Sequence, residues 1–216
     1  MLVGSRTNRH PRCDACYLHV ELCMCDTFRA LSTRTHLALI WHRDEARKTT
    51  NTGRLALRTL ENSSAYIRGM KDAPVDLRPL ETPSRRLFVL FPTSGARVLT
   101  REMVEESDKP ITLAVPDATW RQARAMVRRE PILARATKVI PPPGRPSRYQ
   151  LRRAPEPDHL STAEAIARSF GVLEGASVQK EIERVFEIMV KRTLEMRQPT
   201  SKKSRFRGNS DEFSTK

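Results

Sequence analysis

The stretch VPDATWRQARAM (115–126) places a carboxylate, a hydroxyl and an indole where an apolar segment gives way to a helical pattern. Asp117 can take or orient a proton, Thr119 can hydrogen-bond a ligand, and Trp120 can stack on a heterocyclic ring. The same residues also suit a structural role, in which Asp117 or Thr119 caps the helix and Trp120 fills the core. The sequence by itself leaves both interpretations open.

All four cysteines lie within thirteen residues, in the segment CDACYLHVELCMC (13–25). A Cys-x-x-Cys pair followed by a Cys-x-Cys pair is typical of a structural zinc site, where four thiolates leave no open position for water. The alternative is four ordinary free thiols, since disulfides are rare in the reducing compartment that we expect for this chain. The expected zinc ligands are Cys13, Cys16, Cys23 and Cys25.

The overall composition favours one α/β domain with a polyanionic partner. The chain has 216 residues, and its 39 basic against 25 acidic residues give a net charge of +14. RNA, DNA and anionic lipid all fit that charge. No apolar stretch approaches the roughly 20 residues that span a bilayer, and the N-terminus has no secretory signal, so we expect a cytoplasmic protein without a membrane partner.

Strand-like and helical patterns alternate along the chain. Strands are expected at 35–41, 86–91, 111–117 and 137–140, and helical patterns run through 55–60, 98–106, 120–130, 161–174 and 177–197. This alternation predicts an α/β fold with a mostly parallel sheet flanked by helices. The expected organisation is an N-terminal arm with the zinc knuckle (1–30), one main domain (31–197) and a disordered basic tail (198–216).

Polar clusters follow three of the expected strands, and ligands of open α/β sheets bind beyond the carboxyl ends of strands. Each cluster also has a purely structural reading: TTNTGR can cap a helix, PTSG is common turn chemistry, and Ser161 with Glu164 fits a capping box. The chain has no glycine-rich dinucleotide or P-loop signature and no Gly-x-Ser-x-Gly elbow. A cofactor must therefore be held in another way, and a serine hydrolase is disfavoured.

Arginines gather on both sides of this expected cleft. Arg121, Arg124 and Arg128 share one face of the helix that begins at Trp120, and further arginines crowd the proline-rich loop near Arg148. Each run is either a solvated face or part of a track for phosphates, and their placement around the cleft favours the second reading.

Six motifs in one order resemble the DTW-domain family, the tRNA-uridine aminocarboxypropyltransferases. They are the cysteine segment, TNTGRLA (50–56), LFPTS (90–94), DATW with ARAM (117–126), YQLR (149–152) and STAEA (161–165), and they cover roughly residues 9 to 170. The resemblance implies a SPOUT-like α/β fold for 31–197, with a C-terminal trefoil knot. Nothing in the spacing of the residues indicates that knot.

The resemblance also implies a reaction: transfer of the 3-amino-3-carboxypropyl group from S-adenosylmethionine to a uridine ring nitrogen in tRNA, giving acp3U and methylthioadenosine. In this reading Asp117 is a base or an orienting acid, Thr119 bonds the cofactor, and Trp120 packs on adenine or uracil. The bacterial members suggest a variable-loop uridine. The implied cofactor-binding residues are Phe91, Pro92, Thr93, Ser94, Asp117, Tyr149, Leu151, Arg152, Ser161, Thr162 and Glu164.

Arg152 is a candidate partner for either the methionine carboxylate or a tRNA phosphate. The implied tRNA-binding residues are His42, Glu45, Asn51, Thr52, Arg54, Arg121, Arg124, Arg128 and Arg148. Two rival functions stay open: a SPOUT-type RNA methyltransferase that uses the same cofactor, and a non-catalytic zinc-containing RNA-binding protein. The sequence leaves open the tRNA species and whether the protein is a monomer or a homodimer.

Overall fold

The computed structural model describes residues 11–70, 72–151 and 159–197. In this part of the chain, six strands form one sheet in which every pairing is parallel. The strands are β1 (His36–His42), β2 (Ser63–Arg68), β3 (Arg86–Leu90), β4 (Arg97–Val98), β5 (Ile111–Asp117) and β6 (Thr137–Ile140), in the order β2-β1-β5-β3-β6-β4. The prediction of a mostly parallel α/β sheet flanked by helices is confirmed.

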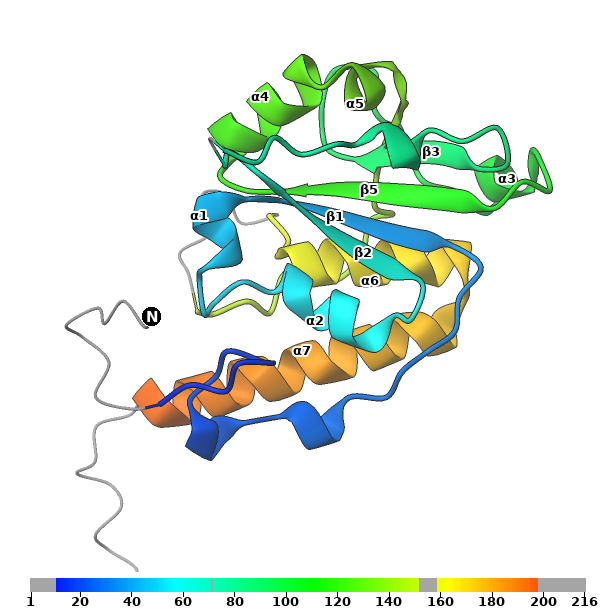
Figure 1. Ribbon diagram of the computed structural model, residues 1–216. Coiled ribbons are helices and arrows are strands. Elements are labelled where there is room, and N and C mark those ends of the chain that lie inside the picture. Colours follow the sequence, from blue (N-terminus) through cyan, green and yellow to red (C-terminus); the bar gives the residue numbers. More distant parts are fainter. Residues whose placement is uncertain (1–10, 71, 152–158, 198–216) are drawn as a thin grey trace, which may run out of the picture.

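Helices cover both faces of the sheet (Figure 1). Helices α4 and α5 lie on one face, and α2 and α6 lie on the other, with α7 beyond them. The helices are α1 (Arg43–Ala46), α2 (Gly53–Thr59), α3 (Arg101–Glu105), α4 (Trp120–Arg129), α5 (Pro131–Arg135), α6 (Thr162–Leu173) and α7 (Ala176–Arg197). Short 3₁₀ turns are η1 (Val20–Leu22), η2 (Cys25–Thr27) and η3 (Arg78–Leu80).

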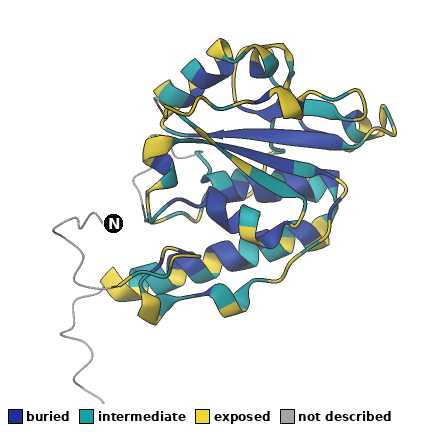
Figure 2. Cartoon of the chain, viewed as in Figure 1, coloured by how far each residue is buried: buried dark blue, intermediate teal, exposed yellow. Residues whose placement is uncertain are grey.

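The core is divided by the sheet because side chains alternate along each strand. Leu37 and Leu39 of β1 pack toward α6, whereas Ala38 and Ile40 pack toward α4. All seven residues of β5 are buried, as expected for a central parallel strand covered on both faces. Figure 2 shows this dark blue central layer between the helices.

The sequence reading missed two strands. No strand was expected between residues 41 and 86, where Ser63–Arg68 form the edge strand β2, which pairs with β1. Residues 97–98 pair with β6 as β4, and the helix expected from Val98 begins only at Arg101, because Thr100 is its N-cap. Both are edge strands with little buried surface, which weakens the apolar alternation that marks a strand.

The cysteine segment packs on α7 and on the first turns of α2 and α6. A third cluster joins Cys16, Leu18 and Met24 to Leu55, Leu151 and Ala163 and to the α7 side chains Val185, Phe186, Met189 and Val190. Arg184 and Arg192 of α7 donate hydrogen bonds to carbonyls of Thr27, Leu22 and Cys23. Within the described residues, no helix is long and apolar enough to cross a membrane.

Candidate active site

The register of the two central strands brings Trp41 and Asp117 together at the carboxyl end of the sheet. Trp41 of β1 lies opposite Asp117, which ends β5. The chain then reaches Thr119, the N-cap of α4. The junction that the sequence singled out therefore lies beside the loop that follows β1.

Asp117 accepts three hydrogen bonds in the protein interior. Asn51 Nδ2 and Trp41 Nε1 donate to Oδ2 at 2.6 and 3.0 Å, and Thr162 Oγ1 donates to Oδ1 at 2.8 Å. Only 5% of Asp117 is exposed. Burial raises the pKa of the Asp117 carboxyl above its ordinary value, against the opposing effect of the three donors. The carboxylate thereby ties β5 to β1, to the loop before α2 and to the start of α6.

The loop before α2 is built to approach this carboxylate closely. A Cβ atom on Gly53 would lie 2.8 Å from Asp117 Oδ2, so the position has no room for a side chain. Asn51 Oδ1 accepts from the backbone N–H of Arg54 at 3.1 Å, and Thr52 Oγ1 accepts from that of Ala163 at 3.2 Å. The Tyr149 hydroxyl donates to the carbonyl of Thr50 at 2.6 Å.

The start of α6 is a capping box whose carboxylate also holds a neighbouring loop. Ser161 is the N-cap, and Glu164 accepts from its backbone N–H at 2.8 Å. The Glu164 carboxylate accepts further bonds of 2.7 Å from Ser147 Oγ and from the backbone N–H of Arg148. Glu164 and Ser161 are buried and serve this structural network.

Trp120 lies at the surface, so the interpretation that it fills the core is wrong. Its side chain is 40% exposed. Its ring centroid lies 4.8 Å from that of His159 and 5.9 Å from that of the buried Phe91. Thr119 does cap α4: its hydroxyl donates to Gln122 Oε1 at 2.7 Å and accepts from the Gln122 backbone. The aromatic group faces the segment after β3, where Pro92, Thr93 and Ser94 are exposed.

His42 ends β1 and is the N-cap of α1, which contains Glu45. His42 accepts from the backbone N–H of Asp44 at 3.3 Å, and its Nδ1 lies 3.3 Å from Gln122 Nε2. Glu45 is buried, and it accepts from Lys48 Nζ at 2.5 Å.

Arg54 is a buried cation near the Asp117 carboxylate. Its side chain is 5% exposed, and Nη2 donates to the carbonyl of Ala46 at 2.8 Å. Nη1 is buried and has no hydrogen-bond partner among the described residues. Burial lowers the pKa of the guanidinium, while Tyr17, Asp117 and Cys16 act in the opposite direction.

Other predicted ligand residues lie on different surfaces. Arg121, Arg124 and Arg128 are exposed on α4, opposite the buried face formed by Ala123, Met126 and Val127. Arg148 forms an ion pair with Glu187. Leu151 is buried beside α7, and Arg152 lies outside the described residues.

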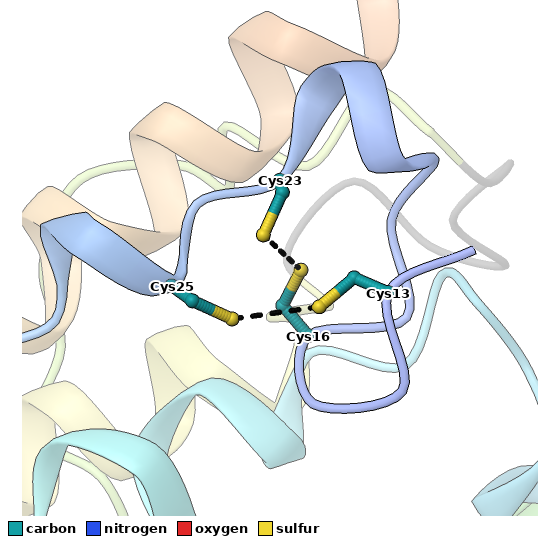
Figure 3. Close-up of side chains that lie close together, drawn as sticks. All are labelled: Cys13, Cys16, Cys23 and Cys25. Atoms are coloured by element: carbon teal, nitrogen blue, oxygen red, sulfur yellow. Dashed lines mark hydrogen bonds between the residues drawn. The ribbon is translucent and has the colours of Figure 1, made fainter. Parts of the chain in front are cut away.

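The four cysteine sulfurs converge on one point (Figure 3). All Sγ atoms lie within 4.8 Å of one another, with 3.6 Å between Cys13 and Cys25 and 3.8 Å between Cys16 and Cys23. Backbone N–H groups of Cys16 and Ala15 lower the pKa of the Cys13 thiol to about 6, whereas burial raises that of Cys25 to about 12. The group is a candidate metal site.

Similarity to known protein families identifies the family of this chain. A family model described as the DTW domain matches residues 10–194. The chain belongs to the DTW domain family.

Two relatives of this DTW chain carry the same name. The "tRNA-uridine aminocarboxypropyltransferase 2" of Drosophila melanogaster is 30% identical over 177 residues, which cover 77% of this chain and 68% of the fly protein. Its namesake in Macaca fascicularis is 26% identical over 171 residues, 77% of this chain and 57% of the macaque protein. The match therefore spans little more than half the length of the macaque relative.

One solved structure is also similar to the DTW chain. It is described as the SAM-dependent rRNA:acp-transferase Tsr3 from Vulcanisaeta distributa. The TM-score is 0.45 at 15% identity, with 74% of this chain and 78% of that chain covered.

Three of the six motifs meet at the Asp117 carboxylate, where DATW contacts TNTGRLA through Asn51 and STAEA through Thr162. The sequence reading missed three neighbours: His159 against Trp120, Gln122 beside His42, and Tyr17 over Arg54. His159 stands two residues before Ser161, and that proximity to a motif was the signal available. No periodicity could have paired Tyr17 with Arg54.

Proposed function

We propose that the protein transfers the 3-amino-3-carboxypropyl group of S-adenosylmethionine to a uridine in tRNA. The observation that carries this proposal is the DTW match over residues 10–194, shared with relatives named for that activity. The uridine ring nitrogen attacks the γ-carbon of the methionine part, the bond from that carbon to sulfur breaks, and its electron pair stays on sulfur. The products are acp3U and methylthioadenosine, and the proton of the ring nitrogen passes to a base.

In this proposal the protein acts chiefly by positioning, because the sulfonium already activates the carbon. The exposed segment Pro92–Ser94 offers the backbone N–H groups of Thr93 and Ser94 to the donor. The start of α6 plays a supporting part, since Ala163 N–H already bonds Thr52 and Glu164 holds the loop at Ser147. Phe91, Tyr149 and Leu151 pack behind these contacts, and Thr162 orients Asp117.

We assign Asp117 the role of an organising acid, not that of the base. Its three donors support this choice, because they already engage both carboxylate oxygens, whereas a base needs an oxygen that is free to take the proton. Thr119 acts through the N-cap of α4, which carries Trp120. The exposed indole of Trp120 stacks on a heterocyclic ring of the donor or of the acceptor.

Arg54 lies too deep for a backbone phosphate, so we assign it to the donor side. Its buried, unpartnered Nη1 suits the carboxylate of the group that is transferred. His42 lies beside Gln122 of α4, and Glu45 is held by Lys48. Asn51 and Thr52, from the loop just before this cation, hold Asp117 and the start of α6. Contacts to tRNA phosphates come from the exposed arginines of α4 and from Arg148. The basic tail at 198–216 stays a predicted tRNA contact that lies outside the described residues.

We propose that the cysteine group holds one structural zinc ion. A tetrahedral site with Zn–S bonds of about 2.3 Å places its sulfurs about 3.8 Å apart. The separations of 3.6 and 3.8 Å in this group fit that geometry, and four thiolates complete the coordination. A knotted path, which rests on the family resemblance, and a cytoplasmic location, which the sequence analysis predicts, are further parts of the proposal.

Nucleoside mass spectrometry tests the reaction. The purified protein is incubated with S-adenosylmethionine and unmodified tRNA, and both products are measured. We expect acp3U and methylthioadenosine in equal amounts. Release of S-adenosylhomocysteine with a methylated base would instead establish a methyltransferase, and tRNA binding without either product would establish a binding protein.

Metal analysis tests the zinc site. We expect one zinc per wild-type chain and loss of that zinc in Cys13→Ser, because a hydroxyl is a poor zinc ligand. Asp14→Ala is the matched control, since Asp14 is an exposed neighbour within the same knuckle. A fully folded wild-type protein that lacks metal would refute the site.

A further inference from the structure

Tyr17 lies between the cysteine group and the buried Arg54. The Arg54 Cζ atom is 3.7 Å from the centroid of the Tyr17 ring and 5.8 Å from that of Trp41. A guanidinium at this distance from an aromatic face makes a cation–π contact, which is strongest where water is excluded. Arg54 is nearly fully buried, so this contact holds the cation where it has few other partners.

The contact continues into the candidate active site. The backbone N–H of Arg54 donates to Asn51 Oδ1 at 3.1 Å, and Asn51 Nδ2 donates to Asp117 Oδ2 at 2.6 Å. The other ring beside Arg54, Trp41, donates to the same carboxylate oxygen at 3.0 Å. Tyr17 is therefore connected to the central carboxylate through three successive contacts, with Arg54 and Asn51 between them.

The backbone of Tyr17 is held in an unusual conformation. Its φ of 61° is the only positive φ of a non-glycine residue in the described ranges. Such a conformation is unfavourable for an aromatic residue and persists only where the surroundings enforce it. The neighbours Cys16 and Leu18 are buried, and Arg12 Nη1 donates to the Tyr17 carbonyl at 3.2 Å. The knuckle fold thus presents this ring to Arg54.

From these contacts we infer that Tyr17 is a positioning residue, through which the metal-binding knuckle holds Arg54 in the active site. The cysteine segment then serves the chemistry indirectly, beyond any part in gripping tRNA. This inference rests on the proposed function for the role of Arg54 as the group that receives the donor carboxylate. Its structural half, the link from the knuckle to the Asn51 loop, stands on the contacts alone.

Two substitutions at Tyr17 distinguish the roles of its aromatic ring, its hydroxyl group and its backbone conformation. Tyr17→Asn removes the ring at a position where asparagine tolerates positive φ, so the knuckle itself should fold at least as well. Tyr17→Phe keeps the ring and removes only the hydroxyl. Val20→Ala is the matched control, because it truncates an exposed side chain of the same knuckle. All variants are prepared as full-length, zinc-loaded chains.

We expect Tyr17→Asn to keep one zinc per chain and to bind tRNA within about twofold of wild type. Its KM for S-adenosylmethionine should rise by roughly tenfold, the order of a desolvated cation–π contact. Amide hydrogen exchange in residues 51–55 should also accelerate by roughly tenfold, because the Arg54–Asn51 bond loses its support. Tyr17→Phe and Val20→Ala should match wild type in each measurement.

Three results would overturn the inference: wild-type KM and exchange in Tyr17→Asn, loss of zinc from that variant, or a defect in tRNA affinity alone. An equal defect in Tyr17→Phe would move the role to the hydroxyl and would also contradict it. Failure of the proposed function looks different. In that case wild type releases no methylthioadenosine, while hydrogen exchange still reports whether Tyr17 holds the Asn51 loop.

Discussion

Trp41 and Asp117 lie opposite each other on neighbouring parallel strands, and the indole Nε1–H donates to Asp117 Oδ2 at 3.0 Å. The bond closes the carboxyl end of the sheet between β1 and β5. With the donors Asn51 and Thr162 it makes one buried carboxylate the meeting point of strands, loop and helix. Substitution of Asp117 should therefore disturb the arrangement of these elements more than the local charge.

Asp117→Asn should remain folded and active, with kcat/KM lowered by less than about tenfold. The asparagine oxygen can accept from Trp41 and Asn51, while its amide group donates to Thr162 Oγ1. Asp117→Ala leaves two buried N–H donors unpaired, at roughly 1–3 kcal/mol each, and should abolish activity. Product formation and urea unfolding distinguish the two variants. If the asparagine variant is folded but as inactive as the alanine variant, Asp117 is the base.

The contribution of Asp117 to stability should decrease as the pH rises, because its pKa is raised in the folded protein. Burial raises the pKa of this carboxyl, so the folded protein binds the proton more tightly than the unfolded chain. The resulting stabilisation is complete below the unfolded pKa of about 3.9 and is lost as the pH rises through the folded pKa. The unfolding free energy of wild type minus that of Asp117→Asn should therefore fall with increasing pH. A rise would mean that the three donors outweigh burial.

Gly53→Ala should destabilise the protein by roughly 1–3 kcal/mol and reduce turnover. Alanine normally favours a helix over glycine, but here its Cβ would lie 2.8 Å from Asp117 Oδ2 and 3.0 Å from a Leu39 methyl. Gly171→Ala within α6 is the control, since its new methyl meets the flexible side chain of Gln179. Thermal unfolding and kcat are measured for both. Equal stability in the two variants would contradict the close approach.

Trp120→Ala should raise KM for tRNA or for S-adenosylmethionine by roughly tenfold, the order of one lost ring-stacking contact. The unfolding free energy should change little, because the side chain is 40% exposed. Trp120→Phe should be intermediate, and Ile67→Ala, which truncates another exposed apolar side chain, should match wild type. A large loss of stability with unchanged KM would return Trp120 to a packing role.

Replacing Arg121, Arg124 and Arg128 together by glutamine should weaken tRNA binding and lower the salt slope by roughly 2 to 3, because each phosphate contact contributes close to one. The maximal rate at saturating tRNA should persist. The matched control removes the same charge elsewhere, at the exposed Arg78, Arg97 and Arg101, and should change the slope less. Equal slopes in both triple variants would show that α4 adds only net charge.

Strong local patterns made much of this fold predictable. The largely apolar run ITLAV (111–115) indicated the central strand, and Ser161 with Glu164 indicated the start of α6. The sheet order was not predictable, because strand neighbours depend on contacts between distant residues. The edge strand β2 shows the same limit, since its exposed residues, Ala65 and Ile67, are apolar and its partly buried residues include two serines and an arginine.

The candidate site likewise contains some residues that the sequence predicted and others that it could not. Motif residues identified Asp117 and its donors Asn51 and Thr162, because each lies at the end or start of a recognisable element. Tyr17 and Arg54 are 37 residues apart, and their stacking depends on how the knuckle packs. The surface position of Trp120 was equally hidden, since an indole beside an apolar strand suits a core as well as a rim.

The hydrogen bonds from Arg184 and Arg192 to the carbonyls of residues 22–27 also constrain how the protein can assemble on the ribosome. The cysteines are close in sequence, so the metal can be captured early in translation. The segment also packs on α2 and α6, but both arginine donors belong to α7, which is synthesised well over a hundred residues later. Until α7 is present, the segment that places Tyr17 on Arg54 lacks these bonds, so the part of the protein that is synthesised first completes its packing last.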